Sequence, residues 1–173
     1  MVICKNGHHY EQGLNSKVRY KQGCPLCNPK KSVPELSFYE LCKKYVDNST
    51  ISGSKINNWE IDIFLPSLKY CIEYDGKRYH NSEDSKDREI RKNKSILSSN
   101  YAMIRIKETD NLKDFKRFKE IKNGVIIYYI NSDQRNKYFK RFSDIFKDLF
   151  KKSIEISEIK EAFNNIKNNL RNS

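Results

Sequence analysis

Two neighbouring apolar segments near the middle of the chain carry acidic residues where a buried strand normally has none. Residues 60–65 alternate like a strand and include Asp62, and residues 68–74 form a second strand-like run that includes Glu73. A short proline-containing turn separates them, which predicts a hairpin. A buried, unpaired carboxylate is costly, and a divalent cation would offset that cost because hard cations prefer carboxylate oxygens. We therefore expect Asp62 and Glu73 to form half of a metal site.

The net charge of the chain indicates what kind of partner it binds. Its 173 residues include 34 Lys and Arg against 22 Asp and Glu, which gives a formal net charge of +12. A surplus of this size favours a polyanion, either nucleic acid or an anionic membrane. The alternative is a lysine-rich bias of an AT-rich genome, which raises the charge without any function.

No apolar run reaches the roughly 18 residues that a membrane-spanning helix needs. The amino terminus also lacks the pattern of a signal peptide. We therefore expect no membrane partner and a cytoplasmic location, in a bacterial or phage-infected cell. The length suits one main domain with a small appendage.

Apolar spacing along the chain predicts an α/β fold with a mixed sheet flanked by helices. The predicted helices cover residues 34–45, 87–98, 112–121, 138–150 and 154–170. The predicted strands cover residues 60–65, 68–74, 101–106 and 124–130. Residues 48–58 are rich in Ser, Asn and Gly and are expected to form a loop.

Three further features concern the core and the first helix. Ser32 and Ser37 are alternative N-caps of that helix. Cys42 and Cys71 lie in apolar contexts and are expected to be small core residues. The aromatic face of residues 138–149 is expected to pack in the core or in a dimer interface.

The first 30 residues contain a cluster of cysteine and histidine. Cys4 precedes His8 by four positions, and Cys24 precedes Cys27 by three. Zinc prefers thiolate and imidazole ligands in two close pairs separated by a loop. Metal binding would also explain how such a polar segment folds. His9 is an alternative to His8, and free thiols or a disulfide between Cys24 and Cys27 is the alternative to zinc.

This segment resembles a treble-clef zinc ribbon over residues 4–27, with Tyr10 where that family usually has tryptophan. Such ribbons commonly accompany nucleases and other domains that act on DNA. The resemblance implies a structural Zn²⁺ bound by Cys4, His8, Cys24 and Cys27.

A set of motifs follows in a fixed order along residues 32–108. They are Ser32-x-Pro34-Glu35 at a helix start, Glu60-Ile-Asp62 before Pro66, Ile72-Glu73-Tyr-Asp75-Gly76 before Tyr79-His80, a charged helix and the strand at 103–108. In this order they resemble the PD-(D/E)xK nuclease superfamily, in its branch of very-short-patch-repair and phage homing-type endonucleases. The resemblance implies a restriction-endonuclease-like core at 32–110, between the zinc ribbon at 1–31 and a basic, largely helical extension at 111–173.

The resemblance further implies an endonuclease that uses Mg²⁺ or Mn²⁺ to hydrolyse phosphodiester bonds in double-stranded DNA. Asp62 and Glu73 would hold the metal, which activates water and neutralises charge on the phosphate. Glu35, with Glu40 as its alternative, would add a carboxylate, and His80 would act as general acid or base or hold a phosphate. Six basic residues would contact DNA: Lys77, Arg78, Lys86, Arg88, Arg91 and Lys94.

The chain departs from the superfamily pattern at one position. Asp75 stands two residues after Glu73, where the superfamily has lysine, although the repair-endonuclease branch also lacks it. Asp75 is a candidate metal ligand, and Lys77 or His80 could replace the lysine. An inactive DNA-binding module and a zinc-stabilised protein-interaction factor therefore stay open as alternatives. Restriction, homing and nicking roles, and a homodimer, also stay open.

Overall fold

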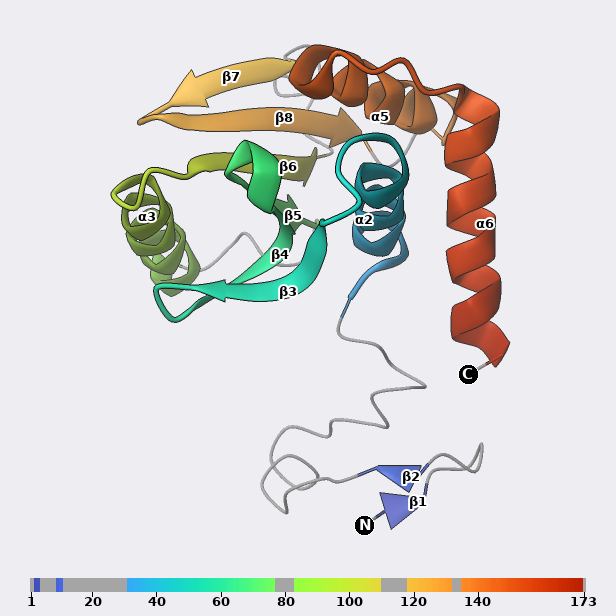
Figure 1. The fold of residues 1–173 in the computed structure, drawn as a ribbon, viewed down its shortest axis with the longest axis horizontal. Helices are drawn as coiled ribbons and strands as arrows, with labels where there is room; N and C mark the ends of the chain where they lie inside the picture. Colours follow the sequence, from blue (N-terminus) through green and yellow to red (C-terminus); the bar gives the residue numbers. More distant parts are fainter. Residues whose placement is uncertain are drawn as a thin grey trace.

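A mixed sheet of six strands organises the computed structural model of this chain (Figure 1). In spatial order the strands are β3 (Ile51–Ile56), β4 (Trp59–Leu65), β5 (Tyr70–Asp75), β6 (Ala102–Thr109), β8 (Val125–Asn131) and β7 (Lys119–Lys122). The central strands β5, β6 and β8 are parallel, and the outer pairs are antiparallel. The structure describes residues 2–3, 9–10, 31–76, 83–109, 118–131 and 135–172.

Helices cover both faces of the sheet (Figure 1). One face carries α2 (Val33–Tyr45), α5 (Arg135–Phe150) and α6 (Ile156–Asn172), and the other carries α3 (Glu83–Leu97). Since both faces are covered, the central strands have buried apolar side chains on both faces, as parallel strands usually do; Glu73 of β5 and Arg105 of β6 are buried charged exceptions. The prediction of an α/β fold with a mixed, helix-flanked sheet is confirmed. Strands β1 (Val2–Ile3) and β2 (His9–Tyr10) pair in a separate small antiparallel sheet.

The larger core lies under α2, α5 and α6. The ring of Phe38 from α2 packs against Phe142 and Phe146 from α5, with ring centroids 5.4 and 4.8 Å apart. The aromatic face of α5 is therefore core. Cys42 belongs to the same cluster, and Cys71 belongs to the smaller cluster under α3. Both cysteines are fully buried, as predicted.

The start of α2 is fixed by a capping box. The Ser32 hydroxyl accepts a hydrogen bond from the Glu35 amide at 3.3 Å, and the Glu35 carboxylate accepts one from the Ser32 amide at 3.4 Å. This reciprocal pair satisfies two amides that a helix start leaves open. Ser37 instead donates to the Val33 carbonyl. Ser32 is thus the N-cap, and the box also fixes Glu35.

Two predicted elements differ from the structure. The predicted loop at 48–58 is wrong, because Ile51–Ile56 forms edge strand β3, whose pairing with β4 outweighs its polar composition. The predicted helix at 112–121 is wrong at its end, where Lys119–Lys122 forms β7; residues 110–117 lie outside the described part. Asn123 and Gly124, both with positive φ, form the turn into β8, and Asn-Gly is typical of such hairpins.

The part of the chain after residue 110 joins the same sheet as the part before it. Strand β8 pairs in parallel with β6, from Ile104 with Ile126 to Thr109 with Asn131. The domain boundary predicted at residue 110 therefore falls between strands of one sheet. Among the described residues, none of the helices has the length and apolar character needed to cross a bilayer.

The first prediction concerns the contact between α2 and α5. Phe38→Ala removes a fully buried ring and should lower the free energy of unfolding by about 3–5 kcal/mol. Urea denaturation followed by circular dichroism measures this change. Leu68→Ala, at a side chain that is 41% exposed, is the control and should change stability by less than about 0.5 kcal/mol. Equal effects of the two substitutions would contradict this packing.

Candidate active site

Asp62 on β4 and Glu73 on β5 lie side by side. The Asp62 amide donates to Glu73 Oε1 at 3.2 Å, and the Tyr74 amide donates to Asp62 Oδ2 at 2.9 Å. Each carboxylate thus takes a backbone hydrogen bond from the neighbouring strand, in place of the regular ladder. Glu73 is only 7% exposed. The structure therefore brings together the two carboxylates that the sequence singled out.

At Asp62, the pairing of β4 with β5 has ended, and its pairing with β3 is interrupted before it resumes at Ile61. Its pairing with β5 runs from Leu65 to Ile63 and stops there, and its pairing with β3 skips the position where Asp62 would face Gly53. Gly53 has φ +72°, and a Cβ there would lie 3.1 Å from Lys31 Nζ. Beyond this irregularity Ile61 packs under α3, whereas Ile63 packs in the larger core. The interruption leaves room for side chains where ladder bonds would be.

Glu35 adds a third carboxylate from the first turn of α2. Its Oε2 is held by the capping box, while its Oε1 is buried without a hydrogen-bond partner in the described structure. Burial raises the pKa of Glu35 from 4.5 to about 7, and the charges of Asp62 and Glu73 add to this. Glu40, its alternative on the same helix, is exposed and instead lines a cleft between α2 and α6.

The other two carboxylates are also poised toward protonation. Burial raises the pKa of Asp62, against the lowering effect of the Tyr74 amide. Burial, followed by the charge of Asp62, raises the pKa of Glu73 to about 7, against the lowering effect of Lys92 and Arg105. Glu35 and Glu73, which are buried, and Asp62, which is half-buried, therefore disfavour one another's charge. A cation placed among them would lower all three pKa values.

Lys92 is a site residue that the sequence analysis did not single out. It comes from α3 and reaches both Glu73 Oε2 and the Glu60 carbonyl, with its side chain only 12% exposed. A signal for it exists in the sequence. Lys92 stands four residues before Ile96, the buried residue of α3, so both lie on the same helix face.

Asp75 forms an ion pair with a buried arginine, Arg105. Both of its oxygens accept hydrogen bonds from Arg105 Nη1, at 2.7 and 2.6 Å. Arg105 is 3% exposed, receives support from Asn93 Oδ1 at 3.1 Å, and lies 4.0 Å from Glu73 through Nη2. The structure therefore places Asp75 as the anchor of Arg105, which stands beside Glu73. Arg105 is the second site residue that the sequence analysis missed.

The remaining candidates divide into two groups. Lys86, Arg88, Arg91 and Lys94 are exposed along α3, and the Arg88 guanidinium lies 5.9 Å from the centre of the Trp59 ring. Lys86 and Arg88 line a cavity of about 550 Å³ together with Glu73, Asp75 and Lys92. The other candidates lie outside the described residues: Cys4, His8, Cys24, Cys27, Lys77, Arg78 and His80.

The carboxylates match a hard divalent cation in the chemistry of their oxygens. Their raised pKa values and the unpartnered Glu35 Oε1 mark a place where positive charge would be stabilising. Within the described part of the chain, however, no three His, Cys, Asp or Glu side chains already form a metal-binding group. Lys92 provides the cation nearest to Glu73 in this arrangement.

Comparison of the chain with protein-family models, with curated proteins and with solved structures finds no match. The interpretation of the site therefore rests on its own geometry and chemistry.

The pKa of Glu35 leads to a prediction about stability. Because its folded pKa is about 7 against an ordinary 4.5, the folded state binds the proton more tightly than the unfolded state. Its contribution is complete below about pH 4.5 and is lost as the pH rises to about 7. Glu35→Gln keeps a capping residue and should be more stable than the wild type at about pH 8, by on the order of 1 kcal/mol allowing for solvent contact.

Urea denaturation at about pH 5 and about pH 8, without added divalent cations, measures this difference. Glu40→Gln changes an exposed glutamate of the same helix and is the matched control, which should follow the wild type at both pH values. Parallel pH profiles for the wild type and Glu35→Gln would contradict the buried, charge-disfavouring environment of Glu35.

Proposed function

We propose that this chain is a Mg²⁺- or Mn²⁺-dependent endonuclease that hydrolyses phosphodiester bonds in double-stranded DNA. The observation that carries the proposal is the convergence of Glu35, Asp62 and Glu73, from three different elements, in a buried group with raised pKa values. Of the three, Glu73 lines a cavity of about 550 Å³, and perturbed carboxylates at a cavity are typical of functional sites. The net charge of +12 and the resemblance to PD-(D/E)xK nucleases support DNA as the substrate.

Asp62 and Glu73 would hold the cation, with Glu35 beside them. When bound, the metal would activate water and neutralise charge that develops on the scissile phosphate. Glu35 has a buried oxygen without a partner and a pKa of about 7, which suits a group that orients water and exchanges a proton with it. His80, just after the described end of β5, is proposed as the second acid or base.

The superfamily has a lysine at the position of Asp75. Lys92 is proposed to supply that positive charge instead. Its ammonium comes from α3 and contacts the same Glu73 carboxylate, and its three donors suit a phosphate oxygen or a water. Asp75 then serves through Arg105, which it holds beside Glu73. In this assignment Asp75 positions a cation and does not bind the metal.

The basic residues of α3 are proposed to position the substrate. Phosphate contacts fix the register of a protein on DNA without reading its sequence. Lys86 and Arg88 line the cavity that contains Glu73, and Arg91 is exposed on the same helix. Lys77 and Arg78 precede His80 and are proposed for the same role.

The amino-terminal residues 1–31 are proposed to form a zinc ribbon that helps to bind DNA. Its ligands would be Cys4, His8, Cys24 and Cys27, with a structural Zn²⁺ that folds the segment. The restriction-endonuclease-like core at 32–110 would then share one sheet with the basic extension at 111–173, through strands β6 and β8. One such site makes one nick, so a double-strand cut requires a homodimer or two successive cuts.

A second candidate function is an inactive DNA-binding module. The ion pair between Lys92 and Glu73 favours it, because Glu73 already has a cation. The two functions differ in whether DNA is cleaved. The inactive module would bind DNA with a steep dependence on salt and would not cleave it with any divalent metal.

The cleavage test uses supercoiled plasmid and linear duplex with Mg²⁺, with Mn²⁺ or without added metal. The wild type should nick or linearise DNA only with metal. Asp62→Ala and Glu73→Ala should each lower the rate by more than about 100-fold, since each removes charge that stabilises the transition state. Glu40→Ala is the control and should cleave like the wild type. Cleavage by Asp62→Ala at the wild-type rate would refute the site.

A further inference from the structure

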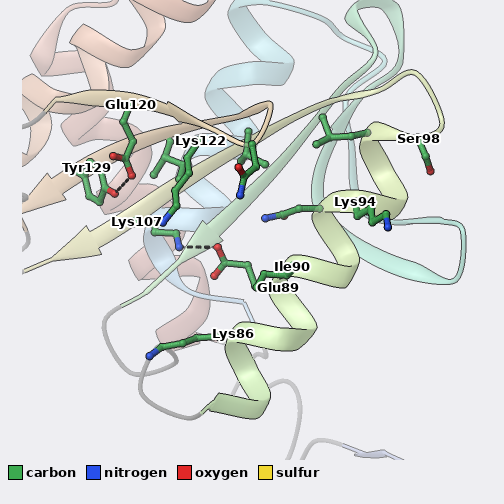
Figure 2. Close-up of a pocket in the computed structure, with 14 residues that line it drawn as sticks. Lys86, Glu89, Ile90, Lys94, Ser98, Lys107, Glu120, Lys122 and Tyr129 are labelled. Atoms are coloured by element: carbon green, nitrogen blue, oxygen red, sulfur yellow. Dashed lines mark hydrogen bonds and ion pairs between the residues drawn. The ribbon is translucent and has the colours of Figure 1, made fainter.

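A groove runs beside the carboxylate site, between α3 and the hairpin of β7 and β8 (Figure 2). It has a volume of about 740 Å³. Apolar side chains from both sides form its floor: Leu97 of α3 with Val125 and Ile127 of β8. Ile90 of α3 also lines the groove and is 62% exposed. The groove thus combines an apolar floor with access to solvent.

Lysines stand on opposite walls of this groove. Lys86 and Lys94 come from α3, and Lys122 comes from β7 (Figure 2). All three are exposed, and no carboxylate pairs with them in the part of the chain that the structure describes. The fourth lysine, Lys107, is by contrast paired with Glu89 at 2.8 Å. Glu120 also lines the groove and accepts a hydrogen bond from the Tyr129 hydroxyl. The lining therefore has four lysines against two glutamates, and this positive surplus lies on both sides of the apolar floor.

The groove is continuous with the cavity of the carboxylate site. Four residues line both: Lys86, Glu89, Lys107 and Tyr129. A polyanion that lies in the groove would therefore lead directly to Glu73 and Lys92, which line the adjoining cavity. This continuity favours the substrate itself as the occupant, rather than an unrelated partner.

We infer that the groove binds a single nucleic-acid strand next to the phosphate that is cleaved. Phosphates would contact Lys86, Lys94 and Lys122, and unpaired bases would lie over the floor. The bases of a duplex are stacked on one another and cannot contact an apolar floor. Grooves for single strands combine basic residues with aromatic side chains on which bases stack, and Tyr129 is the aromatic residue in the lining of this groove. A volume within the range of about 300–1,000 Å³ for small-ligand sites suits a few nucleotides and not a duplex.

This inference rests on the proposed nuclease function and specifies which DNA substrate the nuclease would prefer. The preferred substrate would be duplex DNA with a single-stranded segment beside the cleavage point, such as an overhang or a flap. A blunt duplex would lack the strand that fills the groove.

Fluorescence anisotropy measures binding of a labelled blunt duplex and of the same duplex with a single-stranded overhang. Buffer without Mg²⁺ or Mn²⁺ separates binding from cleavage. We expect the overhang to tighten binding on the order of tenfold, because the extra strand adds phosphate contacts and covers apolar surface of the groove. Lys94→Ala/Lys122→Ala should remove most of this gain and lower the salt slope by about 1.4, at about 0.7 per single-strand contact.

Two further variants sharpen the test. Lys152→Ala/Lys167→Ala removes the same charge from exposed positions away from the groove and should retain the overhang gain. Ile90→Ala should weaken binding of the overhang without a change in the salt slope, because it removes an apolar contact only. All the substituted side chains are exposed, so thermal unfolding should match the wild type and exclude misfolding as a cause.

Equal affinity for blunt and overhang duplexes would overturn the inference and leave the groove to an acidic peptide. Retention of the overhang gain in Lys94→Ala/Lys122→Ala would also overturn it. Failure of the proposed function gives a different result, namely no metal-dependent cleavage of any DNA by the wild type, whatever the binding preference.

Discussion

The structure depends on the burial of carboxylates where the pairing of β4 with β5 ends and its pairing with β3 is interrupted. The Asp62 and Tyr74 amides, which a regular ladder would pair with carbonyls, donate to side-chain carboxylates instead. Such an arrangement survives only if other groups balance the buried charge. Lys92 and Arg105 do this from α3 and β6. These charged side chains therefore connect α3 to the hairpin of β4 and β5 and to the central strand β6.

Much of this site follows from local patterns in the sequence. Asp62 and Glu73 stand out because acidic residues interrupt apolar strands, and Glu35 because it belongs to the Ser32-x-Pro34-Glu35 motif at a predicted helix start. The apolar spacing of the helices and of β5, β6 and β8 also predicts the class of the fold. In each case the signal lies within a few residues, so a single sequence can carry it.

The parts that were missed depend on tertiary contacts or on polar edges. Lys92 and Arg105 become site residues only because α3 packs over β5 and β6, although the spacing from Lys92 to Ile96 marks the inward face of the helix. Strands β3 and β7 lie at the sheet edges, where exposure removes the apolar signal. The Asn-Gly turn at Asn123 was the available signal for the β7–β8 hairpin.

The segment after residue 110 has a role that its basic composition did not indicate. Its strand β8 extends the central parallel sheet, and its hairpin forms one wall of the groove that reaches the carboxylates. The proposed substrate groove and the core of the sheet are therefore built from the same strands. Any substitution that moves β8 should disturb the groove together with the sheet.

Calorimetric titration of the protein with Mn²⁺ at about pH 6.5 tests the central claim most directly. Repeating it in buffers with different ionisation enthalpies gives the number of protons released on binding. Because carboxylates with raised pKa values must lose protons to bind metal, the account predicts one Mn²⁺ site that releases protons. Asp62→Asn and Glu73→Gln should abolish that site. Absence of Mn²⁺ binding, or binding that both variants retain, would contradict the account.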